Sequence, residues 1–164
     1  MNLGFYVHNT SQSNLNSEIF SVLNELIQNH DVDDATLFYN EIDHNPSLDN
    51  KSFGLFNSTD MWSFHGTLFI TSLQLLPLAS KVVNKIKLVY LHTAESINKG
   101  DVGSVMDLIN LSDKVTKVAK SEKDAKEYKR LTGKEIKVMK AFNAKEILEV
   151  WYGQVWPKSH KYVP

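Results

Sequence analysis

The chain has 164 residues, with 18 Lys and Arg against 19 Asp and Glu, and therefore a net charge of −1. A nearly neutral chain has no basic excess with which to hold a phosphate backbone, so nucleic-acid binding is disfavoured. Cysteine is absent, which excludes disulfide scaffolds, zinc–thiolate sites, iron–sulfur clusters and a cysteine nucleophile.

The first half of the chain alternates apolar runs with polar or periodic segments. Residues 3–8 predict a buried strand, and apolar residues spaced by three and four predict a helix over residues 19–27. Further apolar runs predict strands at residues 35–39, 53–56 and 67–71.

The second half continues this alternation. A helix is predicted over residues 73–85, with a kink at Pro77, because proline lacks the N–H that an interior turn requires. Further helices are predicted along residues 102–109, after Ser121 up to Gly133, and after Asn143 up to Gly153. Strands are predicted between them, at residues 87–91, 115–119 and 136–139.

This succession of elements predicts the fold class. Short continuous apolar strands that alternate with helices are typical of an open parallel sheet covered on both faces. We therefore expect an α/β, doubly wound, mostly parallel sheet of about seven strands, Rossmann-like, in one domain over residues 1–153. Residues 154–164 would form a tail that packs back on the sheet or mediates association.

The apolar runs are too short for a membrane span, since the longest, residues 68–78, is interrupted by polar residues and Pro77. The first eight residues lack the cationic start and long apolar core of a secretory signal. We therefore expect a cytoplasmic location.

Ligands of doubly wound sheets bind beyond the carboxyl ends of the strands, near the point where the strand order reverses. The candidate site residues are therefore the polar residues that follow each strand, whose groups suit a sugar or another neutral polar ligand. Many residues of these types also serve only as helix caps. The candidates are His8, Asn9, Thr10, Ser11, Asn57, Ser58, Thr71, Ser72, His92, Thr93, Glu95, Ser96, Ser121 and Glu122.

Two of these candidates, His8 and His92, directly follow strands and could converge on one cleft. A neutral imidazole there could act as an acid, a base or a hydrogen-bond donor, or it could simply be satisfied by the backbone. No G-x-S-x-G motif supports a serine hydrolase. Neither glycine-rich phosphate motif occurs, so no nucleotide cofactor is expected. The acidic run at residues 31–34 is interpreted as a solvated turn, and no metal site is expected.

Residues 67–72, the run KIKLVYLHTAES and the run LSDKVTKVAKSEKDAKEYKRLTGKEIKVMKAFN carry a resemblance. Together they resemble the N-terminal, acceptor-side half of retaining glycosyltransferases of the GT-B fold. The resemblance implies that His92 lies beside the transferred sugar and that Ser121 caps a helix on the acceptor side. The chain departs from that pattern in having Thr71 where many members have His, and in lacking glycines in its first loop.

The resemblance implies a glycosyltransferase-like domain that binds a sugar or sugar nucleotide. The family's second domain, which holds the donor, is not in this sequence, so a hexosyl transfer would need a complementary domain. The alternative is a non-enzymatic interaction protein that assembles, for example as a homo-oligomer, through Trp151, Tyr152 and Trp156. A stand-alone flavodoxin-like enzyme is less favoured, because no cofactor loop is visible.

Overall fold

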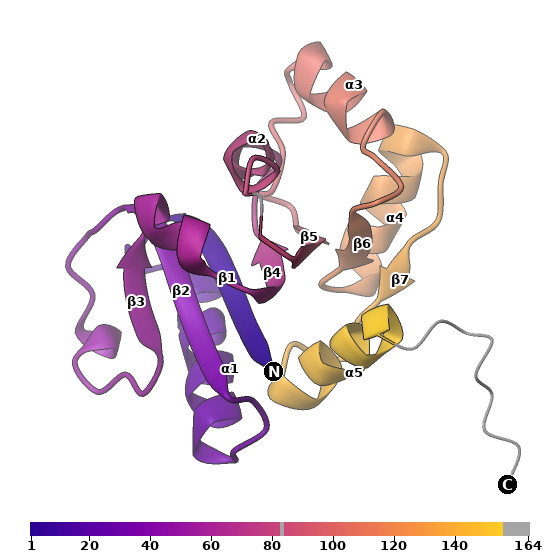
Figure 1. Ribbon diagram of the computed structural model, residues 1–164. Coiled ribbons are helices and arrows are strands. Elements are labelled where there is room, and N and C mark those ends of the chain that lie inside the picture. The colour runs from indigo at the N-terminus through magenta and orange to yellow at the C-terminus, as the bar shows by residue number, and fades with distance from the viewer. Residues whose placement is uncertain (83, 156–164) are drawn as a thin grey trace, which may run out of the picture.

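The computed structural model describes residues 1–82 and 84–155. Its centre is a seven-stranded sheet of the order β3-β2-β1-β4-β5-β6-β7, in which every neighbouring pair is parallel (Figure 1). The predicted α/β, doubly wound, Rossmann-like class is therefore confirmed. The strands are β1 (Asn2–Asn9), β2 (Asp34–Glu41), β3 (Gly54–Asn57), β4 (Gly66–Ile70), β5 (Ile86–His92), β6 (Thr116–Ala119) and β7 (Lys137–Val138).

The described part of the chain has five α-helices and three short 3₁₀ helices, which lie between the strands except for the last α-helix, which follows β7. The α-helices are α1 (Asn14–Gln28), α2 (Leu76–Ala79), α3 (Val102–Ile109), α4 (Glu122–Thr132) and α5 (Ala144–Val155). The 3₁₀ helices are η1 (Pro46–Leu48), η2 (Ser58–Ser63) and η3 (Leu73–Leu75).

Two sequence predictions about helices are wrong. In the described part of the segment 73–85, the helical residues are η3 and the single turn of α2, which ends at Ala79. Ser72 caps η3, and Pro77 lies in the first turn of α2, where its missing N–H costs nothing. The last helix does not stop at Gly153 but continues to Val155. Gly133, by contrast, ends α4 in the left-handed conformation with φ of 73°.

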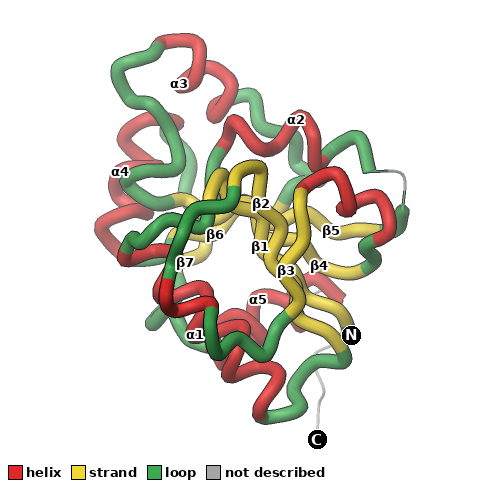
Figure 2. The backbone as a smooth tube through the Cα atoms, turned by 90° about the vertical axis from the view of Figure 1, so that its left-hand side faces the viewer, coloured by secondary structure: helices red, strands yellow, loops and turns green. Residues whose placement is uncertain are grey.

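Helices cover the two faces of the sheet unequally. On one face, α1 and α5 pack on side chains that alternate along the strands, such as Phe5, Val89 and Leu91. On the other face, η2, α2, α3 and α4 cover the intervening positions, including Tyr6 and Tyr90. Figure 2 shows α1 and α5 on one side of the strands and α2, α3 and α4 on the other.

The strand order shows at which edge of the sheet a ligand is expected. The chain runs outward from β1 to β3, returns to β4 beside β1, and then runs outward to β7. The strand order therefore reverses between β1 and β4, and a ligand of this fold class would be expected beyond their carboxyl ends. His8 lies at the end of β1, and Thr71 and Ser72 directly follow β4.

Candidate functional site

Two hollows of about 270 and 210 Å³ lie at this reversal point. Both are lined by His8, Ser72 and Glu95, which come from the ends of β1, β4 and β5. We call the two hollows together the switch-point cleft. The prediction that polar residues after separate strands meet at one edge therefore holds for these three side chains.

The exposed polar side chains that line the switch-point cleft are His8, Gln74, Glu95 and Asn98. His8 is exposed, and its Nε2 lies 3.3 Å from the hydroxyl of the buried Ser72. Glu95 is also exposed. Leu15 and Leu73 add apolar surface to the walls, and neither hollow is lined by Lys or Arg. The lining therefore offers hydrogen-bonding groups and one carboxylate, without a fixed cation for a phosphate.

The loop after β1 is held by its own side chains. The Oδ1 of Asn9 accepts hydrogen bonds from the backbone N–H and the hydroxyl of Ser11, at 3.1 and 2.5 Å. Thr10 is fully buried, and its hydroxyl donates to the carbonyl of Asp43 at 2.7 Å and accepts from the Asp43 N–H at 2.8 Å. Asn9 and Ser11 line the cleft, whereas Thr10 lies inside the loop's own hydrogen-bond network.

Two buried asparagines that were not among the sequence candidates hold the carbonyls of the same loop. The Nδ2 of Asn16 donates to the carbonyls of Asn9 and Ser11, at 3.1 and 2.8 Å. The Nδ2 of Asn45 donates to the carbonyl of Thr10 at 3.0 Å and to that of Ser11 at 3.3 Å. A loop fixed in this way needs no glycine, because side-chain amides satisfy the carbonyls that its bends leave free.

The residues that follow β4 have mainly structural partners. The hydroxyl of Thr71 donates to the carbonyl of Tyr6 at 2.9 Å and so joins β4 to β1 at their carboxyl ends. The hydroxyl of Ser72 accepts from the N–H of Gln74 at 3.4 Å and caps η3. Both residues line the cleft, but Thr71 has already used its only donor.

His92 lies behind the wall of the cleft and not at its surface. Its side chain is fully buried, with Nδ1 3.0 Å from the hydroxyl of Tyr90 and 3.3 Å from that of Ser96. Its Nε2 lies 3.4 Å from Oε1 of Glu127, which is also paired with Lys99. Ser96 lines the cleft and therefore separates it from His92. A catalytic role for His92 stays a prediction.

Burial determines the protonation state of His92. Removal of the imidazole from water lowers the pKa of His92, and the nearby carboxylate of Glu127 opposes that shift only in part. The imidazole is therefore neutral at pH 7 and pairs with Tyr90 and Ser96 as a neutral group. The pKa of the Tyr90 hydroxyl is raised, mainly by its own burial.

Thr93, Glu95 and Ser96 form the turn that follows His92. The hydroxyl of Ser96 accepts from the Thr93 N–H at 3.0 Å and donates to the Thr93 carbonyl at 2.8 Å. The Glu95 N–H donates to the hydroxyl of Thr93 at 3.3 Å. Thr93 is buried in this turn, while the side chain of Glu95 points to the cleft. The turn thus presents Glu95 and keeps Thr93 as support.

Four other candidates lie away from the switch-point cleft. Asn57 caps η2 by accepting from the Thr59 N–H at 3.0 Å, and Ser58 is buried beside it. Ser121 caps α4, and Glu122 lines a separate hollow of about 300 Å³ between α4 and β7. These residues follow β3 and β6, which are two strands removed from the reversal point on either side, so the structure does not bring them together with the residues of the switch-point cleft.

The structure describes Trp151 and Tyr152, two of the three C-terminal aromatic residues proposed for association. Trp151 and Tyr152 lie on α5 with ring centroids 4.7 Å apart in an edge-to-face arrangement, and Tyr152 is half exposed. Trp156 and the rest of the predicted tail after Val155 lie outside the described residues.

The structure also bears on metals and membranes. Across residues 1–82 and 84–155, no group of three or more His, Asp or Glu side chains could hold a metal ion. None of the helices in that part of the chain is long and apolar enough to cross a bilayer.

Comparison of the chain with models of protein families, with curated proteins and with solved structures gave no match. The function is therefore argued from the residues of the switch-point cleft alone.

Proposed function

We propose that this chain binds a sugar, free or as part of a sugar nucleotide, in the switch-point cleft. The observation that carries the proposal is the convergence of His8, Ser72 and Glu95 from three strand ends on two adjoining hollows. Ligands of doubly wound folds bind at this position. Imidazole, hydroxyl, amide and carboxylate groups are suited to the many donors and acceptors of a sugar.

The charge of the lining favours the sugar over the phosphates of a nucleotide sugar. The lining contains the carboxylate of Glu95 and no Lys or Arg. A carboxylate accepts hydrogen bonds from sugar hydroxyls but repels a diphosphate. The rigid first loop, which carries side chains at every position, also leaves little room for close backbone approach of a phosphate.

Transfer of the bound sugar, or transfer to it, would need a second reactant in the same cleft. We therefore propose that any glycosyltransferase activity depends on a complementary domain that holds the donor. That domain is the partner that the proposal implies, and His92, through Ser96, would act on the ligand only indirectly.

The binding proposal is tested by thermal unfolding with free hexoses and nucleotide sugars at millimolar concentration. A ligand at 100 times its dissociation constant stabilises by about 2.7 kcal/mol, which shifts Tm by several degrees. We expect a shift for the unaltered chain that is lost in Glu95→Ala. The control is Glu122→Ala, which removes a carboxylate from the other hollow and should keep the shift. Stabilisation by no sugar, or equal shifts in all three proteins, would overturn the proposal.

A second candidate function is self-association through α5. Tyr152 is 51% exposed beside Trp151, and aromatic residues are enriched in protein interfaces. Light scattering of the unaltered chain and of Tyr152→Ser over a concentration series tests this candidate. A dimer that the substitution dissociates supports it, and a monomer at every concentration rejects it.

A further inference from the structure

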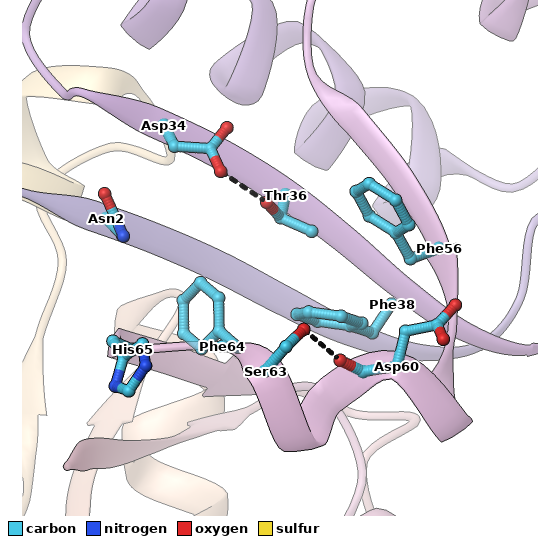
Figure 3. A pocket seen from close by; sticks show the side chains of 9 residues that line it. All are labelled: Asn2, Asp34, Thr36, Phe38, Phe56, Asp60, Ser63, Phe64 and His65. Carbon is cyan, nitrogen blue, oxygen red and sulfur yellow. Dashed lines mark hydrogen bonds between the residues drawn. The ribbon is translucent and has the colours of Figure 1, made fainter. Parts of the chain in front are cut away.

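Another hollow, of about 380 Å³, lies away from the switch-point cleft on one face of the sheet. It extends over β1, β2 and β3 on the face opposite α1, where the short helix η2 packs on β2 and β3. Its floor consists of Phe38, Phe56 and Phe64, and its rim carries polar side chains (Figure 3). The sugar proposal does not use this hollow.

Two glycines, Gly54 and Gly4, leave the space on the sheet that the rings of Phe56 and Phe64 occupy. A Cβ atom on Gly54 would lie 2.8 Å from Cε2 of Phe56, and one on Gly4 would lie 3.2 Å from Cζ of Phe64. Each ring therefore occupies space on the sheet surface that a larger residue would fill. Phe38 lies between them, with ring centroids 6.4 Å from Phe56 and 5.5 Å from Phe64. The result is a connected aromatic floor that is still partly open, since Phe56 is 47% exposed.

Carboxylates stand at the two ends of this floor. Asp34 begins β2, and Asp60 lies in η2 beyond the carboxyl end of β3, so the two acids are on opposite sides of the rings (Figure 3). Phe38 lies four positions after Asp34, which is about 13 Å along a strand. The hydroxyl of Thr36 donates to Oδ2 of Asp34 at 3.5 Å. No Lys or Arg lines the hollow, and His65 is the one basic side chain among its lining residues.

An elongated pocket with an acid at each end and aromatic rings between them matches one class of ligand. Ammonium groups pair with carboxylates through charge-assisted hydrogen bonds, and alkyl chains next to ammonium groups are attracted to ring faces. A compact metal dication would leave the rings unused, and an anion would be repelled by both acids. We propose that this hollow binds a linear aliphatic polyamine, with its end ammonium groups at Asp34 and Asp60 and its alkyl chain over Phe38 and Phe56.

The test is a titration of the full chain with spermidine, followed by calorimetry and by amide chemical shifts. Hexylamine and Mg²⁺ serve as comparison ligands, since the first has one ammonium group and the second has charge without an alkyl chain. We expect spermidine to bind most tightly and to shift amide signals of β2, β3 and η2. Removal of one exposed ion pair weakens binding about threefold, so the double variant Asp34→Asn, Asp60→Asn should bind about tenfold more weakly.

The matched control is Asp107→Asn, which neutralises an exposed acid on α3 and should leave the affinity unchanged. Phe56→Ser should weaken spermidine and hexylamine but not Mg²⁺, and circular dichroism checks that each variant is folded. Equal affinity for spermidine and Mg²⁺ would overturn the proposal and indicate unspecific charge attraction. An unchanged affinity in the double variant, or shifted signals confined to other strands, would overturn it as well.

Discussion

The Nε2 atom of His92 lies 3.4 Å from Oε1 of Glu127, and neither atom has a hydrogen-bond partner in the described structure. Both atoms are shielded from solvent by α4, which packs on β5 and carries Glu127. The other carboxylate oxygen of Glu127 pairs with Lys99 at the surface. The ion pair between Lys99 and Glu127 thus lies against the buried, neutral imidazole of His92. Because His92 packs under α4, its protonation state links the stability of α4 to pH.

We expect the stability of the fold to fall as the pH is lowered below about 6.5, the ordinary pKa of histidine. Burial lowers the pKa of His92, so in this range the unfolded chain binds a proton that the folded chain does not. The free energy of unfolding therefore declines until the pH reaches the lower, folded-state pKa of His92. One such group changes it by at most about 1.4 kcal/mol per pH unit.

Urea unfolding between pH 5 and 8, for the unaltered chain and for His92→Gln, measures this contribution. The variant is expected to be less stable at pH 7.5 and to lose less stability on acidification. Parallel pH profiles for the two proteins would show that His92 does not titrate differently on folding. The same experiment on His30→Gln, at an exposed position outside the cleft, corrects for the general effect of removing a histidine.

The strands and their order of succession could be predicted because each strand is a short apolar run. A parallel strand buried on both faces must be apolar at nearly every position, as in β5 with Leu88, Val89 and Leu91. The caps at Ser121 and Gly133 were predictable because each depends on nearby residues. A serine at the start of a helix accepts a hydrogen bond from the N–H three residues later, and the left-handed conformation at the helix end favours glycine.

The inner structure of the site could not be predicted, because it depends on contacts distant in sequence. Asn45 bonds the carbonyl of Thr10, 35 residues earlier, and nothing in its neighbourhood marks that role. The burial of His92 likewise depends on α4, which is contributed by a later part of the chain. The prediction of a helix over residues 73–85 was also wrong, because α2 ends at Ala79, where the Ser80 N–H bonds back to the carbonyl of Leu76.

The buried Asn45 is expected to be a main support of the cleft. Asn45→Ala removes the donor to the carbonyls of Thr10 and Ser11 and should destabilise the fold by about 1–3 kcal/mol, the cost of leaving buried acceptors unpaired. Urea unfolding measures the loss, with the exposed Asn50→Ala as the control. Equal stability of the two variants would mean that the loop does not depend on this amide.

Two glycines are expected to respond to alanine in opposite directions. Gly66 has φ of 134°, and a Cβ atom there would lie 2.1 Å from the carbonyl oxygen of Asn2, so Gly66→Ala should destabilise by at least about 3 kcal/mol. Gly153 lies within α5 with open space around it, and Gly153→Ala should stabilise by about 0.5–1 kcal/mol. Thermal unfolding of both variants checks the pair, and a change of the same sign at both positions would contradict the argument.

The tautomer of His92 can be deduced from its partners. The hydroxyl of Tyr90 has one proton and lies 2.8 Å from Oγ of Ser96 and 3.0 Å from Nδ1 of His92. Because an unprotonated Nε2 would face the carboxylate of Glu127, we expect Tyr90 to donate to Nδ1. An Nδ1 that accepts leaves the ring proton on Nε2, where it faces the carboxylate of Glu127. We therefore expect nitrogen-15 spectra to show a protonated Nε2 and an unprotonated Nδ1. In Tyr90→Phe, Nδ1 loses its donor, and the tautomer preference should weaken together with a stability loss of about 1 kcal/mol. A protonated Nδ1 in the unaltered chain would reverse the direction of the hydrogen bond with Tyr90 and leave two unprotonated atoms facing each other at Glu127.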